Sequence, residues 1–218
     1  MIDEPKETKK EKRDAARQAR IEQQRRRQRA RRRKKMLIGG ISIVLAVALV
    51  GFTVVKVSQS KARSQAAVKA AATAAGCDGM IEYPDAGRRH VDNLPPDQRK
   101  PYTSTPPTSG DHYGVLPPPP SFYPDTALRP EVYVHSLEHG QIVIHYNDIP
   151  QAQIDELEKL QSEHSGSTVV MKDPDIKAPV AITGWRYLEQ CKQASKPVIE
   201  NFIAQRCNKG PENFHLEC

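Results

Sequence analysis

The chain has 218 residues, with 33 Lys and Arg against 26 Asp and Glu, and a formal net charge of +7 at pH 7. Residues 1–35 hold 16 basic and six acidic side chains, whereas residues 36–218 hold 17 and 20, a net charge of −3. A uniformly basic protein is therefore excluded, and the two parts of the chain suit different surroundings.

Residues 36–55 read MLIGGISIVLAVALVGFTVV and contain no charge. At about 1.5 Å per residue they extend about 30 Å, the thickness of a bilayer core, which predicts a transmembrane helix. The preceding run RRRQRARRRKK is typical of a cytoplasmic flank. We interpret it as a topology signal that contacts membrane lipids, and nucleic acid is not an expected partner.

The sequence thus predicts a single-pass signal-anchor protein of the cell membrane, with a cytoplasmic N-terminus. Its parts are a basic cytoplasmic arm, a transmembrane helix, an Ala-rich helical stalk and an extracytoplasmic domain, at residues 1–35, 36–55, 56–76 and 77–218.

The outer domain begins with an irregular, proline-rich segment, residues 83–125, which we expect to pack over a sheet. The residue patterns that follow predict β-strands and helices in turn. The strands are expected at 131–135, 141–146, 167–172 and 179–187, and the helices at 150–164 and 195–207. This order predicts an α+β fold with a small, mainly antiparallel sheet, two helices and a long proline-rich loop.

The four cysteines, Cys77, Cys191, Cys207 and Cys218, all lie outside by this topology. An even number in an oxidising compartment predicts two disulfides. We favour Cys77–Cys218, which would tie the ends of the domain together, with Cys191–Cys207, which flank one helical pattern. The other two pairings stay open. A cysteine metal site is disfavoured, because no C-x-x-C spacing occurs.

The run HSLEH, residues 135–139, matches the H-x-x-E-H pattern of one class of zinc peptidases. That chemistry requires a helix, where His135 and His139 share a face and Glu138 acts as base. The flanking EVYV and QIVIHY favour strands instead. We therefore expect the motif to form a hairpin turn and not a peptidase site.

A hairpin turn still brings Glu138 and two histidines together, and they can share a ligand with His112 or His90 of the proline-rich segment. Zn or Cu is the expected metal. Histidines also serve in purely structural networks, and that alternative stays open. His145, inside an apolar run, is interpreted as a satisfied sheet residue.

Three motifs together resemble the bacterial domain-of-unknown-function family 3105: PPTSGDHYG at 106–114, VHSLEHGQIVIHY at 134–146 and GPENFHLEC at 210–218. The resemblance implies one membrane helix before an outer domain, but no particular activity. The matching positions are His90, His112, His135, Glu138 and His139, and His145 falls outside the pattern. The loop after His112 departs from the family, which puts a ligand or disulfide there in doubt.

We therefore predict that the outer domain binds a metal ion or small ligand through His112, His135 and His139, with Glu138 as fourth ligand or orienting group and His90 as a further candidate. One alternative is a membrane-anchored hydrolase or redox enzyme that uses Glu138 or His139 as acid or base. Another is a structural or partner-binding module without a ligand. The sequence identifies no substrate and no protein partner.

Overall fold

The structure is a computed structural model that describes residues 9–117, 121–212 and 214–218. Within the first helix, α1 (Lys9–Ala75), the side chains of residues 9, 11–16, 19, 37–48, 50 and 54 are not described. The predicted membrane span at 36–55 therefore lies largely outside the described side chains. Within the described part of the chain, no helix has the length and apolar character needed to cross a membrane.

The chain divides into two compact units, residues 1–62 and 63–218, and α1 contributes to both. In the second unit α1 ends at Ala75, directly before Gly76, as predicted for the stalk. Ala71 and Ala72 pack against the main core. The stalk end is thus part of the folded domain.

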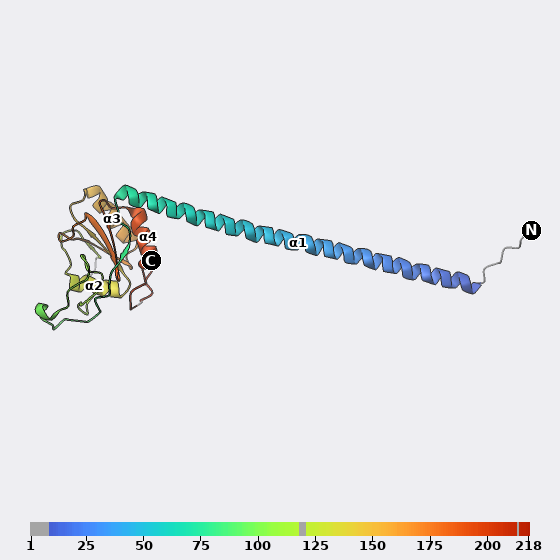
Figure 1. Cartoon of the computed structure of the whole chain (residues 1–218), viewed down its shortest axis with the longest axis horizontal. Coiled ribbons are helices and arrows are strands. Elements are labelled where there is room, and N and C mark those ends of the chain that lie inside the picture. Colours follow the sequence, from blue (N-terminus) through green and yellow to red (C-terminus); the bar gives the residue numbers. More distant parts are fainter. Residues whose placement is uncertain (1–8, 118–120, 213) are drawn as a thin grey trace, which may run out of the picture. The chain divides into compact units, whose positions relative to one another are not determined.

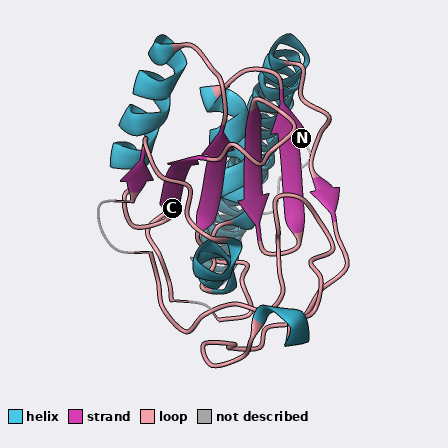
Figure 2. Cartoon of the chain, turned by 90° about the vertical axis from the view of Figure 1, so that its left-hand side faces the viewer, coloured by secondary structure: helices cyan, strands magenta, loops and turns pink. Residues whose placement is uncertain are grey.

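The domain is built on a six-stranded sheet with the order β1-β6-β5-β3-β4-β2 (Figure 2). The strands are β1 (Ile81–Glu82), β2 (Phe122–Tyr123), β3 (Ile142–Tyr146), β4 (Thr168–Lys172), β5 (Val180–Gly184) and β6 (Tyr187–Cys191). A short 3-10 helix, η1 (Pro96–Gln98), lies in the proline-rich segment. Strands β2, β4 and β3 run parallel, whereas the pairings β3–β5, β5–β6 and β6–β1 are antiparallel, so the sheet is mixed, with three antiparallel pairings out of five.

The two faces of the sheet carry separate cores, as the alternation of β3 shows. Ile142, Ile144 and Tyr146 pack with residues of α3 (Gln151–Glu163) and α4 (Lys196–Arg206). Val143 lies on the other face, with Val134 and others of α2 (Pro130–Glu138). Figure 1 shows α2 apart from α3 and α4. The structure therefore has a layer on each face of the sheet, and α2 forms the layer opposite the two other helices.

Helix α2 overturns the predicted strand at 131–135 and, with it, the hairpin. Pro130 stands at the first helical position, where its missing N–H costs nothing. Tyr133, Val134 and Leu137 are buried on one face of the helix. Such a short helix is stabilised by tertiary packing, which here outweighs the β-propensity of Val and Tyr. The domain has three helices after the proline-rich segment and not two.

The predicted strand at 179–187 is in fact two strands, β5 and β6, because the chain turns at Trp185 and Arg186. Arg186 has a φ of +66°, which reverses the chain into an antiparallel pair. The strands predicted at 141–146 and 167–172 are confirmed, as are the helices predicted at 150–164 and 195–207, within a few residues at each end.

The favoured disulfide pairing was wrong. Cys77 pairs with Cys191, and Cys207 pairs with Cys218. Cys191 ends strand β6, where the backbone of the next two residues donates to Ala75 at the end of the stalk, so β6 lies beside Cys77. Cys207 instead ends α4, beside the C-terminal segment. Cysteine spacing cannot reveal which strand edge meets the stalk, which explains the failure.

Candidate metal centre

Helix α2 carries two of the candidate ligands on adjacent turns. His135 and Glu138 are three residues apart and so lie on one face of the helix, with the imidazole Nδ1 of His135 3.8 Å from the carboxylate Oε2 of Glu138. Both side chains are buried. Because the helix packs on the sheet through Val134 and Leu137, its orientation and that of its ligands is fixed by the core.

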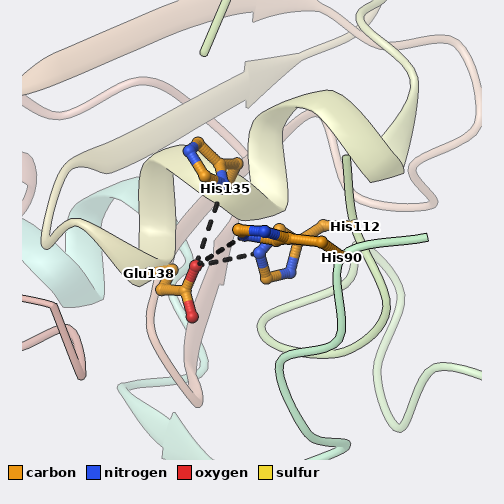
Figure 3. Close-up of side chains that lie close together, drawn as sticks. All are labelled: His90, His112, His135 and Glu138. Carbon is orange, nitrogen blue, oxygen red and sulfur yellow. Dashed lines mark hydrogen bonds and ion pairs between the residues drawn. The ribbon is translucent and has the colours of Figure 1, made fainter. Parts of the chain in front are cut away.

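The other two ligands come from the proline-rich segment, where His90 and His112 form an isolated parallel bridge. Val91 N–H donates to the His112 carbonyl at 2.8 Å, and His112 N–H donates to the Arg89 carbonyl at 3.0 Å. Figure 3 shows that both rings point at Glu138, as does His135 from the helix. Segments that are distant in sequence thus meet at one carboxylate.

Asp111, next to His112, anchors this bridge. Its carboxylate accepts two hydrogen bonds from the Arg89 guanidinium, at 3.0 and 2.6 Å, and one from the Lys100 backbone at 2.9 Å. Burial by itself would raise the pKa of Asp111, but these donors hold it below its usual value. An ionised Asp111 therefore fastens the segment that presents His112.

The four side chains form a compact group. His90, His112, His135 and Glu138 each offer a ligand atom, and these atoms all lie within 4.8 Å of one another. Glu138 Oε2 lies 2.9 Å from His112 Nε2 and 3.7 Å from His90 Nε2. The ring centroids of the three imidazoles are 4.9, 5.3 and 5.2 Å apart. A group of three imidazoles and one carboxylate at these distances can hold a metal ion.

His112 defines the chemistry at the centre of the group. Its Nδ1–H donates to the Gly110 carbonyl at 2.8 Å, so the neutral ring has its lone pair on Nε2. That lone pair faces the Glu138 carboxylate at 2.9 Å. Two lone pairs at this distance repel, unless a proton or a metal cation lies between them. The arrangement is therefore suited to a cation.

The protonation of His135 also suits a metal ligand. Burial, followed by the neighbouring charges of His139, His112 and His90, lowers the pKa of His135 to about 4. The ring is therefore neutral at pH 7 and keeps a free lone pair. Its buried Nδ1 has no hydrogen-bond partner. This nitrogen is therefore available to bond a metal ion that Glu138 also contacts.

His139 lies beside this group and not within it. Its Nε2 is 2.9 Å from the Nε2 of His135, on the side of that ring away from Glu138. The structure brings His90 to the centre in its place. His145, on β3, bonds Asp173 at 2.8 Å and Thr183 at 3.2 Å, in line with its expected structural role.

Comparison with protein families adds to this geometry. The family model DUF3105, described as a protein of unknown function, matches residues 93–217, more than half of the chain. The chain belongs to the DUF3105 family. No curated protein and no solved structure matches the chain.

The DUF3105 match contains three of the four candidate ligands, His112, His135 and Glu138, and begins three residues after His90. Sequence reasoning had found all four. It missed Asp111 and Arg89, which hold the bridge, and Glu212, whose carboxylate lies 3.6 Å from His139 Nδ1. Asp111 stands directly before His112 in the run SGDH of this DUF3105 chain. This adjacency was the signal from which its role could have been predicted.

Proposed function

We propose that this DUF3105 domain binds one zinc ion through His90, His112, His135 and Glu138. The arrangement of the four ligands is the observation that carries the proposal. A tetrahedral zinc ion, bonded to imidazole nitrogen at about 2.0–2.1 Å, spaces three ring centroids by about 5.2 Å. The centroids here lie 4.9 to 5.3 Å apart.

Glu138 fits the fourth corner of the same tetrahedron. Ligand atoms around tetrahedral zinc are about 3.4 Å apart. Glu138 Oε2 lies 2.9, 3.7 and 3.8 Å from the three nitrogens, a mean close to that value. Cu(II) prefers tetragonal nitrogen and oxygen sites, so the ligand arrangement favours zinc over copper.

Four protein ligands leave no open coordination position, which supports binding over catalysis. Three of the four side chains are buried, and only that of His90, 51% exposed, faces solvent. His90 therefore marks the side on which the metal enters and leaves. The role we infer is that of a metal-holding domain, with His90 as the exchangeable ligand.

Metal analysis of the purified full chain tests the proposal. We expect about one zinc per chain, lost from the variants His112→Ala and His135→Ala. His164→Ala, at the end of α3 on the other face of the sheet, is the matched control and keeps its zinc. Wild-type protein that holds no zinc after exposure to it, and gains no thermal stability from it, would refute the proposal.

We propose further that the domain lies outside the cytoplasm, because two disulfides are typical of an oxidising compartment. In this proposal the N-terminal helix attaches the domain to the membrane. The expected result is that a membrane-impermeant protease added to intact cells digests the domain. Protection of the domain in intact cells, with digestion only after lysis, would contradict this location.

A further inference from the structure

The C-terminal segment, residues 208–212 and 214–218, lies across the end of α2 that carries Glu138; we call it the strap. Asn208 N–H donates to the Gly140 carbonyl at 3.0 Å, and Glu212 N–H donates to the Glu138 carbonyl at 3.0 Å. Gly210 passes so close that a Cβ would lie 2.1 Å from the Glu138 carbonyl oxygen. The strap thus binds the backbone of a proposed zinc ligand.

The strap is closed on itself as well as on the helix. The Asn208 side chain donates to the Leu216 carbonyl at 2.8 Å and accepts from Leu216 N–H at 2.7 Å. The Cys207–Cys218 disulfide joins its far end to the end of α4. The strap is therefore a closed loop with a fixed position over α2.

His139 lies under the strap, 7% exposed. The Phe214 ring covers it at 4.0 Å between centroids, and Glu212 Oε2 is 3.6 Å from its Nδ1. On its other side, His139 Nε2 meets His135 Nε2 at 2.9 Å. The ring therefore makes one hydrogen bond, through Nε2, while its Nδ1 has no hydrogen-bond partner and has the Glu212 carboxylate as its nearest charge.

The Nε2–Nε2 hydrogen bond requires one ring to donate and the other to accept, and the charge of Glu212 favours one of the two arrangements. The Glu212 carboxylate favours the proton of His139 on Nδ1, which leaves Nε2 as an acceptor. His135 Nε2–H then donates to it. That places the lone pair of His135 on Nδ1, which faces Glu138. Metal-binding histidines commonly donate their second N–H in this way, which fixes the ring and raises its basicity.

We propose that His139 is a positioning residue of the zinc centre, which fixes the tautomer and orientation of His135, and that the strap holds His139 in place. The inference rests on the proposed zinc site. It assigns to the second histidine of HSLEH, and to the disulfide-closed C-terminus, a role in metal affinity and not only in stability.

The zinc affinity of the full chain, measured by competition with a chromogenic chelator, tests the role of His139. Loss of a residue that orients a ligand typically costs about 10–100-fold in metal affinity, and we expect this loss for His139→Phe. His139→Gln, whose amide reaches the place of Nε2, restores most of the affinity. In the Co²⁺-substituted protein, the visible bands shift in His139→Phe and return in His139→Gln.

A folded His139→Phe protein that binds zinc as tightly as wild type overturns the proposal. Should that variant fail to fold, Glu212→Gln decides, because its side chain is 47% exposed and its loss spares the core. A drop in zinc affinity for Glu212→Gln supports the proposal, and an unchanged affinity overturns it.

The two disulfides provide a matched pair for the strap. We expect Cys207→Ser with Cys218→Ser to weaken zinc binding, and Cys77→Ser with Cys191→Ser to leave it within about twofold of wild type when both proteins are folded. Equal losses in the two pairs would trace the effect to general destabilisation and overturn the role of the strap. If wild type itself binds no zinc, the proposed function fails, which is a distinct result.

Discussion

His112 and Glu138 make an unfavourable pair in the absence of a cation. The imidazole donates from Nδ1 to the Gly110 carbonyl, so its Nε2 lone pair and the Glu138 carboxylate face each other at 2.9 Å. Burial strengthens this repulsion, because water does not screen it. The pair therefore needs a cation between the two atoms, either a metal ion or the proton of a charged imidazole.

Glu138→Gln separates the effect of Glu138 on stability from its effect on zinc affinity. The Gln amide donates directly to His112 Nε2, a hydrogen bond that needs no cation between the two groups, so we expect the metal-free variant to be at least as stable as wild type. Its zinc affinity falls, because the only negative ligand is lost. Urea unfolding in a chelator and zinc competition measure the two quantities. A parallel loss of stability and affinity would show that Glu138 is chiefly structural.

His145 predicts a pH dependence of stability that is independent of zinc. Its full burial lowers its pKa below the ordinary 6.5, although the bond to Asp173 opposes this. The unfolded chain therefore binds a proton near pH 6.5 that the folded chain refuses, so stability falls as the pH drops below 6.5. The pKa of Asp173 is held below 3.8, so this carboxylate contributes only at lower pH.

His145→Gln tests this assignment in metal-free protein. We expect the melting temperature of the variant to decline less between pH 6.5 and pH 4.5 than that of wild type, because Gln does not titrate. The groups that face the ring are Asp173, Thr183 and the Tyr133 ring at 4.9 Å. Equal slopes for variant and wild type would assign the pH dependence to other groups.

At this scale the motifs identified the side chains that the structure brings together. His112, His135 and Glu138 were all candidates, and His90 was a further one. The sequence could not show that His139 lies beside the centre, because that position follows from the helical conformation of α2. On this helix the two ring nitrogens of His135 face different partners. Nδ1 faces Glu138, and Nε2 faces His139.

At the scale of elements, α2 shows why local propensity failed. Its nine residues include two valines and a tyrosine, which favour strands, and no long helical pattern supports it. Pro130 at the start and Gly140 just after the end were the usable signals. The helix exists because Tyr133, Val134 and Leu137 are buried against the sheet, a contact that a local reading does not contain.

Gly140 ends α2 in a conformation that other residues resist. Its φ is +86°, and an added Cβ would lie 2.8 Å from the Cα of Asn208 in the strap. We expect Gly140→Ala to lower the free energy of unfolding by about 1–3 kcal/mol, from backbone strain of this kind. Denaturant titration measures the change.

Gly166→Ala is the control for this substitution, because nothing lies within 4 Å of its added Cβ. Its stability should stay within about 0.5 kcal/mol of wild type, as for ordinary surface changes. If both variants lose the same stability, the close approach of the strap to α2 is not the reason that a glycine is needed at position 140.

At the scale of the whole molecule, the two disulfides close loops of very different length. Cys77–Cys191 spans 114 residues and Cys207–Cys218 spans 11. The chain-entropy model gives about 5 kcal/mol for the first and about 3 kcal/mol for the second. We expect removal of Cys77–Cys191 to cost the more stability, as measured by thermal unfolding of the two double Ser variants.

Peptide mapping without reduction checks the pairing on which this rests, and should yield linked peptides for 77–191 and 207–218 only. The originally favoured 77–218 linkage in that map, or the larger stability loss on removing Cys207–Cys218, would contradict the account. The sequence predicted two disulfides but not their partners, because pairing depends on which strand lies beside the stalk.

The sequence predicted the α+β class of the fold and most of the helices and strands from β3 to α4. The parallel pairing of β3 with β4 was not predicted, and neither were the two edge strands β1 and β2. Two-residue strands give no periodicity from which they could be recognised.

The central claim is a tetrahedral zinc site of three imidazoles and one carboxylate. X-ray absorption at the zinc edge of the purified full chain tests it most directly. The account predicts three imidazole nitrogens and one oxygen at about 2.0–2.2 Å, with no sulfur. A sulfur shell near about 2.3 Å, a six-coordinate oxygen shell, or the absence of bound zinc would contradict it.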